Sequence, residues 1–186
     1  MRVIAGQYRS RPMRSAAGLE LRPTSDRLRE TLFNVLGAVR ELRDTVWVDL
    51  YAGTRAVGIE ALSRGARQVY FVESEKKHAR LLRENLASLG ISEGYEVHER
   101  EVAHSLPLLE STGVVCDFCF LDPPYALRGS YERTLGFLSQ SRLLQQSSII
   151  VAEHEKKFDP GDQFGALLRY RRLDQGDASL SFYRLG

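Results

Sequence analysis

Val114-Val115-Cys116-Asp117-Phe118-Cys119-Phe120-Leu121-Asp122-Pro123-Pro124-Tyr125 is a largely apolar run that ends in an acid, two prolines and a tyrosine. A run of this kind is typical of a buried strand in a parallel sheet. In α/β folds, ligands bind beyond the carboxyl ends of such strands. We therefore expect residues 122–125 to combine an acidic group, a rigid backbone and an aromatic face in one binding site.

Strands and helices alternate on both sides of this run, which predicts an α/β fold with a mostly parallel sheet covered on both faces. The turn cluster Asp174-Gln175-Gly176-Asp177 predicts an antiparallel hairpin at the C-terminus. Near the N-terminus, Gly6 separates two short expected strands, and Thr24, Ser25 and Asp26 are suited to cap a helix. The expected strands are 2–5, 7–14, 46–50, 68–72, 95–100, 114–121, 147–152, 166–173 and 179–185. The expected helices are one that follows the capping residues and runs to about Val39, one entered from the turn 51–58 with Ile59, Leu62 and Ala66 inward, and 76–89, 102–109 and 131–144.

The chain has 186 residues, of which 43% are hydrophobic and 27% are charged. These values predict one globular domain with a short appendage, and we expect a basic extension at 1–22 and a main domain at 23–186. There is no run of about 18 apolar residues that would predict a membrane span. Residues 1–6 lack the apolar core of a signal peptide, so we expect a cytoplasmic protein.

The positive charge of the chain is concentrated at its N-terminus. Residues 1–22 contain five arginines and one acid, Glu20, a balance of +4, although the whole chain carries only +2. Arginine is suited to bidentate contacts with phosphate. This segment is therefore either a solvated, partly disordered arm or an arm that binds the phosphates of a nucleic acid. The candidate arginines are Arg2, Arg9, Arg11, Arg14 and Arg22, together with Arg27 in the following helix.

The two cysteines, Cys116 and Cys119, have the spacing of a metal or redox motif but lie within the expected strand. A structural zinc site needs four ligands, and the chain has no second pair of cysteines. We expect buried, reduced thiols that point to opposite faces of the sheet, and no metal site.

A second set of candidate residues follows the first two strands of the main domain. Asp49 lies at the end of strand 46–50 and is followed by Gly53 and Gly58, and Glu73 follows strand 68–72. Glycines at a strand-to-helix turn let the backbone approach a ligand, and an acid after the second strand can accept hydrogen bonds from ribose hydroxyls. The loop lacks the GxGxxG pattern of a pyrophosphate cradle. A cofactor with ribose and adenine but no phosphate, such as S-adenosylmethionine, fits this pattern better than NAD or FAD.

The sequence resembles the bacterial family of 16S ribosomal RNA guanine-N2 methyltransferases over nearly its whole length. The segment around Arg22-Pro23-Thr24-Ser25-Asp26-Arg27 is specific, whereas Asp-Pro-Pro-Tyr occurs in many amino-methyltransferases. The resemblance implies a Rossmann-like class I methyltransferase fold with seven strands, an antiparallel C-terminal hairpin and a small N-terminal hairpin and helix extension. The matching segments are 2–6, 22–27, 32–34, 49–53, 58–66, Glu73, 85–86 and 122–125.

This resemblance implies specific roles for the residues that surround the expected site. Asp122 and the Pro123 carbonyl are expected to accept hydrogen bonds from the exocyclic amine of an unstacked guanine, and Tyr125 is expected to stack on the base. An acidic contact to the adenine of the cofactor falls at Glu101. The expected cofactor-binding residues are Asp49, Tyr51, Ala52, Gly53, Thr54, Glu73, Glu101 and Val102. The expected partner is ribosomal RNA or the small ribosomal subunit.

The sequence departs from the family pattern at Arg55, where a glycine usually follows Gly53-Thr54. Arginine there is disfavoured if the backbone has a positive φ, and its charge opposes the cofactor sulfonium if it points inward. Two alternative functions therefore remain: transfer to another amine, such as DNA adenine N6 or a protein glutamine, or RNA binding with weakened cofactor affinity. The segment 22–27 has three alternative roles, which are to line the cofactor pocket, to contact RNA or to cap its helix.

Overall fold

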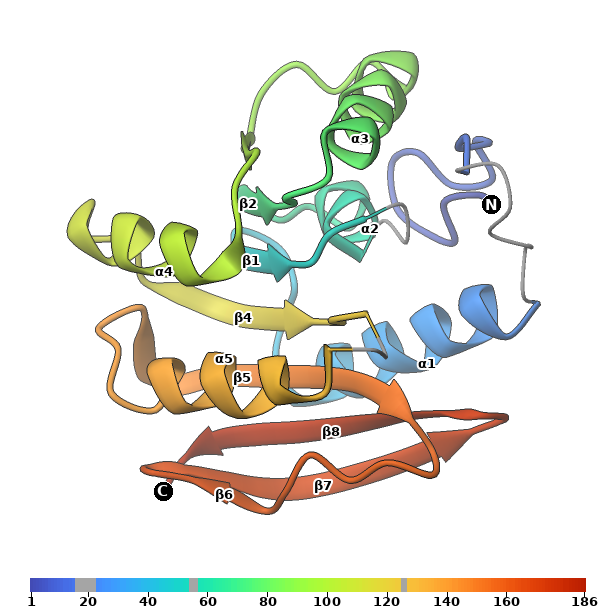
Figure 1. Ribbon diagram of the computed structural model, residues 1–186. Helices are drawn as coiled ribbons and strands as arrows, with labels where there is room; N and C mark the ends of the chain where they lie inside the picture. Colours follow the sequence, from blue (N-terminus) through green and yellow to red (C-terminus); the bar gives the residue numbers. More distant parts are fainter. Residues whose placement is uncertain (16–22, 54–56, 125–126) are drawn as a thin grey trace.

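Eight strands of the described residues form one sheet in the order β3-β2-β1-β4-β5-β8-β7-β6 (Figure 1). The computed structural model describes residues 1–15, 23–53, 57–124 and 127–186. The elements are α1 (Pro23–Val39), β1 (Val46–Leu50), α2 (Val57–Ser63), β2 (Gln68–Val72), α3 (Lys76–Leu89), β3 (Tyr95–His98), α4 (Val102–Ser111), β4 (Cys116–Leu121), α5 (Gly129–Leu138), β5 (Leu144–Glu155), β6 (Gln163–Phe164), β7 (Leu167–Gln175) and β8 (Ala178–Leu185).

The first five strands are parallel to one another, and the last three are antiparallel to their neighbours. The predicted mostly parallel sheet with an antiparallel C-terminal hairpin is therefore confirmed. The expected count of seven strands was one too low, because the chain between β5 and β7 adds the two-residue strand β6. The carboxyl ends of β1, β2 and β4 lie together at one edge of the sheet, where the sequence predicts a site.

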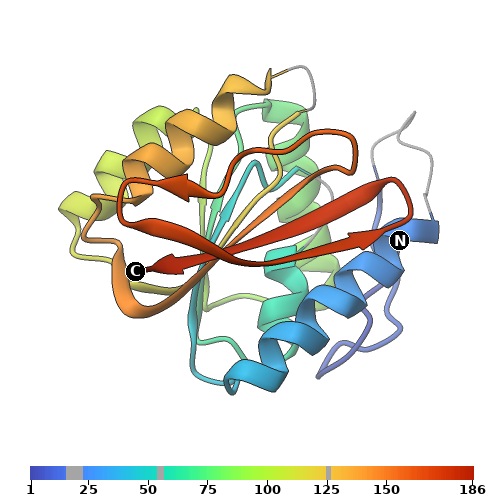
Figure 2. The ribbon, with the colours of Figure 1, turned by 90° about the horizontal axis from the view of Figure 1, so that it is seen from below.

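The sheet is covered by helices on both faces (Figure 2). One apolar layer joins the sheet to α1, α2 and α3, and the other joins it to α4 and α5. Strands β1 and β4 are buried along their whole length, as expected for strands between two layers. In the first layer, the Trp47 ring lies 5.3 Å from the ring of Phe33 and 4.5 Å from that of Phe118. These contacts anchor α1 to the centre of the sheet.

Both cysteines are buried, as predicted, but the prediction that they face opposite sides of the sheet is wrong. Cys116 and Cys119 belong to the same apolar layer, the one that α4 and α5 cover. The pairing of β4 with β5 shifts register between Cys116 and Phe118, which breaks the simple alternation of side chains. Burial raises the pKa of the Cys116 thiol to about 12 and that of Cys119 well above its ordinary value, so both thiols stay protonated.

The N-terminal segment does not form the two expected strands. Its regular pairing is limited to one isolated bridge between Arg2 and Pro12. The segment packs on the domain instead, because the side chains of Val3 and Met13 are buried in the layer of α1 and α2. The carboxylate of Glu60, which is fully buried in α2, accepts hydrogen bonds from the backbone N–H groups of Ile4 (2.8 Å) and Ala5 (3.0 Å). The described part of this segment is therefore held in place.

Several element boundaries also differ from the prediction. Helix α1 begins at Pro23, ahead of the three residues that were expected to cap it, and proline is favoured at a first helical position. Strand β5 is longer at both ends than the expected 147–152 and includes His154. At this end of the strand, His154 is fully buried and bonds to Ser181 Oγ at 2.9 Å. Within the described residues, the helices are all too short or too polar to cross a membrane.

Candidate functional site

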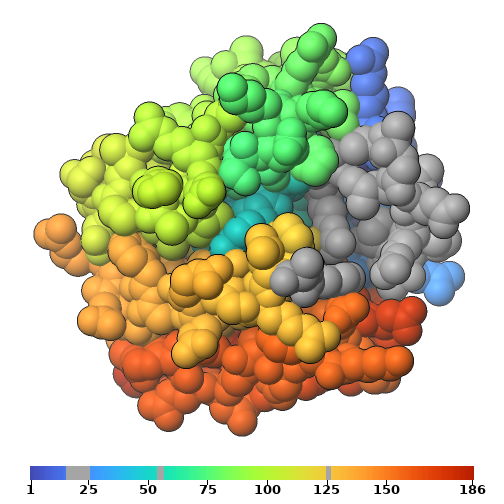
Figure 3. Space-filling model, viewed as in Figure 1, coloured from blue at the N-terminus to red at the C-terminus, as the bar shows by residue number. Residues whose placement is uncertain are grey.

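A cavity of about 780 Å³ opens at the carboxyl ends of β1, β2 and β4 and extends between α4 and α5. Figure 3 shows it as a hollow between the green atoms of α3 and α4 and the gold atoms of α5. Its volume is in the range of pockets that hold nucleoside-sized ligands. It brings together two parts of the site that lie about fifty residues apart in the sequence, Glu73 and Asp122.

The end of β4 forms one side of the cavity, and we call Asp122, Pro123 and Pro124 the β4 clamp. Asp122 is 9% exposed and follows directly after the fully buried Leu121. All three residues of the clamp line the cavity. The proline rings fix two backbone φ angles, so the Pro123 carbonyl has little freedom to move. Tyr125, the fourth residue of the predicted motif, lies outside the described residues.

The end of β2 forms the opposite side, and we call Gly53, Glu73 and Glu75 the β2 wall. One carboxylate oxygen of Glu73 accepts a hydrogen bond from the Gly53 N–H and the other accepts one from the Glu75 N–H, both at 2.7 Å. These bonds fix the orientation of a side chain that is 7% exposed. Each carboxylate oxygen has a further lone pair, so Glu73 can still accept hydrogen bonds from a ligand.

Asp49, which the sequence places beside Glu73 as a cofactor ligand, is not among the described residues that line the cavity. Its carboxylate is 2% exposed and accepts a hydrogen bond at 2.8 Å from the N–H of Gly58, in the first turn of α2. Burial is the main cause that raises the pKa of Asp49 to about 7, and the negative charge of Glu73 raises it further. Asp49 therefore ties the end of β1 to the start of α2.

The loop between β1 and α2 bends sharply at Tyr51. Tyr51 has φ of 58°, a left-handed conformation that costs a non-glycine residue roughly 1 kcal/mol or more. The chain then turns toward β2, where Ala52 N–H donates to the Val72 carbonyl at 3.0 Å and Gly53 adopts φ of 49°. Tyr51 and Gly53 line the cavity, whereas Ala52 is buried behind it. Thr54 and Arg55 lie outside the described residues.

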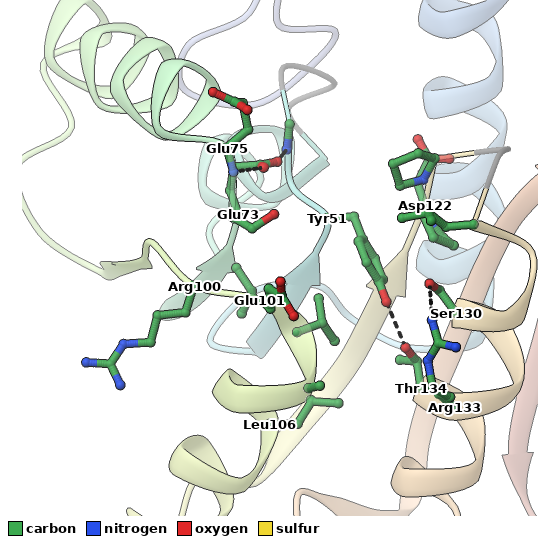
Figure 4. A pocket seen from close by; sticks show the side chains of 18 of the residues that line it. Tyr51, Glu73, Glu75, Arg100, Glu101, Leu106, Asp122, Ser130, Arg133 and Thr134 are labelled. Carbon is green, nitrogen blue, oxygen red and sulfur yellow. Dashed lines mark hydrogen bonds between the residues drawn. The ribbon is translucent and has the colours of Figure 1, made fainter.

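The segment between β3 and α4 contributes a third acid. Glu101 precedes α4 as its N-cap residue, and its side chain makes no capping hydrogen bond. Glu101 is exposed and Val102 is buried, and both line the cavity, as does the adjacent Arg100. Figure 4 shows Glu73 and Glu101 on one side of Tyr51, and Asp122 and Ser130 on the other. The predicted adenine contact and the predicted amine contact thus lie on opposite sides of one cavity.

One side of α5 lines the cavity and was not predicted from the sequence. Ser130, Arg133, Thr134 and Phe137 all line it. Their spacing of three, four and seven residues places them on one helical face, which was the available signal. The sequence pattern did not reveal this face, because its side chains are not uniformly apolar. Further lining residues that were not predicted are Ser74, Glu75, His78, Ala103, Leu106 and Leu127.

The predicted RNA-binding arginines lie away from the cavity, and the five that the structure describes do not line it. Arg11 donates to the carbonyls of Ser88 (2.7 Å) and Leu89 (2.9 Å) at the end of α3. Arg14 pairs with Glu84 at 3.4 Å, and Arg2 lies 4.0 Å from Asp26. Arg9 and Arg27 are exposed and form no ion pair with another described residue. Arg22 lies outside the described residues.

The strand order, the two helical layers and a cavity at the carboxyl edge of the parallel strands define a class I methyltransferase fold. The chain resembles the solved structure "Putative methyltransferase yhhF from Escherichia coli", with a TM-score of 0.81 and 28% identity over 100% of this chain and 97% of that chain. It also shares the fold of a Thermus thermophilus 16S rRNA N2 G1207 methyltransferase solved with AdoMet and guanosine, with a TM-score of 0.70 and 18% identity, over 91% of this chain and 45% of that one.

The chain belongs to the family described as Conserved hypothetical protein 95, whose model matches residues 1–184. Its relatives include the ribosomal RNA small subunit methyltransferase D of Escherichia coli, which is 35% identical over 155 residues. That match covers 83% of this chain and 75% of the relative. The structure offers no group of three or more metal-binding side chains within its described part.

Proposed function

We propose that this protein is an S-adenosylmethionine-dependent methyltransferase that acts on the exocyclic N2 amine of a guanine in 16S ribosomal RNA. The observation that carries the proposal is the pairing of a buried acid at the end of β4, Asp122, with an oriented acid at the end of β2, Glu73, across one cavity. The names of the relatives support RNA as the substrate. A bacterial protein that modifies ribosomal RNA works in the cytoplasm, so we also propose a cytoplasmic location.

The residues of the cavity fit the proposed cofactor. Both oxygens of Glu73 are held by backbone N–H groups. The remaining lone pairs therefore have fixed directions, in which they can accept hydrogen bonds from the two ribose hydroxyls. Glu101 is suited to accept from an adenine amine, and Val102 and Leu106 offer apolar contacts to the ring. When bound, the cofactor supplies an electrophilic methyl group on a sulfonium. We assign Asp49 the role of fixing the start of α2 beside the cofactor site.

The β4 clamp is suited to an amine that is a poor nucleophile. The lone pair of the guanine N2 amine is delocalised into the ring, and its two N–H groups are donors. Asp122 can accept from one N–H and the Pro123 carbonyl from the other, which aims the lone pair along the line of attack. Asp122 is also positioned to take the proton that the amine loses. A neutral amide in place of Asp122 would keep the size but weaken both roles.

The arginines divide into structural and RNA-binding groups. Arg11 is occupied by the end of α3, so its main role is to fix the N-terminal segment. Arg9 and Arg27 are exposed and have no acidic partner among the described residues, so they are the better candidates for phosphate contacts. Arg2, Arg14 and Arg22 complete the proposed RNA-binding set, and Tyr125 and Thr54 remain proposed contacts to the base and the cofactor.

The test is transfer of a tritiated methyl group from S-adenosylmethionine to RNA. The substrates are 16S RNA and 30S particles from a bacterial strain that lacks the corresponding modification. We expect label in the RNA of at least one substrate and none in duplex DNA or in protein. Binding of S-adenosylhomocysteine without any label in RNA would contradict the proposal.

A further inference from the structure

A hydrogen bond crosses the cavity between Tyr51 and Thr134. The two hydroxyl oxygens lie 3.0 Å apart, and both residues line the cavity. Figure 4 shows the Tyr51 side chain reaching from the loop after β1 to the inner face of α5. Thr134 is 3% exposed, so this bond is shielded from water at one end.

The bond links two parts of the chain that have different partners. On one side, Tyr51 is followed by Ala52 and Gly53, whose N–H groups bond to Val72 and Glu73 at the end of β2. On the other side, Thr134 lies in α5, the helix that begins shortly after the β4 clamp. Helix α5 packs in the apolar layer that it shares with α4, whereas the β2 wall lies at the ends of β1 and β2. The Tyr51 hydroxyl therefore connects the β2 wall to the element that follows the β4 clamp.

The backbone of Tyr51 points to the same conclusion. Its positive φ is an unfavourable conformation for a residue with a large side chain, and such outliers persist where the surroundings fix them. Here the bend sends the ring across the cavity instead of along the strand. The fixed Gly53 on one side and the Thr134 bond on the other hold Tyr51 in this conformation.

We propose that the hydrogen bond between Tyr51 and Thr134 is a strut that sets the separation between the β2 wall and the β4 clamp. The inference rests on the proposed function, because this separation determines how the amine meets the methyl group. In-line transfer requires the reacting atoms to lie about 3–3.5 Å apart, and small displacements lower the rate strongly. Tyr51 and Thr134 are therefore positioning residues that act on the transfer step more than on cofactor affinity.

The experiment compares Tyr51→Phe, Thr134→Val and the double variant, each of which removes the bond and preserves most of the packing. We expect kcat for methyl transfer to fall about tenfold in each single variant and no further in the double variant, because one bond is lost in all three. The affinity for S-adenosylhomocysteine, measured by calorimetry, should stay close to that of the wild type. Thr134→Ser keeps a hydroxyl and should recover most of the rate lost in Thr134→Val.

Two controls remove hydroxyls elsewhere. Thr112→Val removes a bond to the Leu109 carbonyl at the end of α4, and Tyr170→Phe removes an exposed hydroxyl on β7. Both should keep the wild-type kcat, and all variants are compared well below their melting temperatures. The proposed strut would be contradicted if the losses of kcat in the two single variants added up in the double variant. It would also be contradicted if the variants lost cofactor affinity at unchanged kcat. A wild-type protein that binds cofactor but transfers no methyl group would instead contradict the proposed function.

Discussion

The β2 wall and the β4 clamp both place a nearly buried acid at the carboxyl end of a parallel strand, yet the two acids are held differently. Glu73 in the wall is oriented by N–H groups from Gly53 and Glu75, one on each carboxylate oxygen. Asp122 in the clamp is followed by two prolines, which stiffen the chain after it. A fixed acceptor suits binding, and an acid beside a rigid carbonyl suits orientation of a reacting amine. The comparison predicts that binding and chemistry can be separated by mutation.

The largest effect is expected at Asp122. The variant Asp122→Asn should lower the rate of methyl transfer by roughly 10²-fold or more, because the amide neither orients the amine as strongly nor accepts its proton. Its affinity for S-adenosylhomocysteine should remain that of the wild type. Parallel calorimetry and transfer assays measure both quantities. A marked loss of cofactor affinity in this variant would mean that the clamp belongs to the cofactor site.

The next effect is expected at Glu73. The variant Glu73→Gln should weaken S-adenosylhomocysteine binding by about 10- to 100-fold, because hydrogen bonds to a charged acceptor are worth about 1.5–3 kcal/mol. Glu93→Gln is the matched control. Glu93 is exposed and does not line the cavity. The comparison between wall and clamp fails if the two glutamine variants bind the cofactor equally well.

Arg9 and Arg27 extend the comparison between wall and clamp to proposed RNA contacts outside the cavity. The double variant Arg9→Glu and Arg27→Glu should weaken RNA binding on the order of tenfold at low salt and reduce the salt dependence of binding. Arg80→Glu with Arg83→Glu is a control with the same change of charge, since both arginines already pair with acids on the surface. Fluorescence anisotropy over a range of salt concentrations measures the effect. Equal losses in the two double variants would indicate a general effect of charge.

The smallest effect concerns Asp49, which lies behind the wall. Its pKa of about 7 is well above the ordinary value, so the folded state holds a proton that the unfolded state loses. The contribution of Asp49 to stability is therefore greatest below about pH 4 and declines as the pH rises to about 7. Relative to Asp49→Asn, which cannot ionise, the wild-type melting temperature should fall across this window. A difference in melting temperature between the two proteins that does not change with pH would contradict the raised pKa of Asp49.

The sequence predicted the parts of the site that follow directly from strand ends. Glu73 and Asp122 were found because a strand pattern and a position after its last residue are both local signals. The same rule placed Asp49 beside them, and it could not distinguish an acid that lines a cavity from one that bonds to the next helix. That difference depends on the direction of one side chain, which here bonds to the N–H of Gly58.

The parts that were missed depend on contacts between distant segments. The face of α5 that carries Ser130 and Thr134 became part of the site only when α5 packed opposite the loop after β1. The N-terminal strands were replaced by a segment whose N–H groups bond to Glu60, more than fifty residues away. Cys116 lies in the same layer as Cys119, and the pairing of β4 with β5 is irregular beside it. None of these contacts leaves a periodic pattern in the local sequence.

The most direct test of the central claim is to identify the methylated atom. 16S RNA or 30S particles are incubated with the protein and S-adenosylmethionine, digested to nucleosides, and analysed by mass spectrometry with fragment mapping. We predict N2-methylguanosine at a defined position, present with the wild type and strongly reduced with Asp122→Asn. A methyl group on another base or on another atom of guanine would contradict the proposed chemistry of the clamp, as would RNA that stays unmodified.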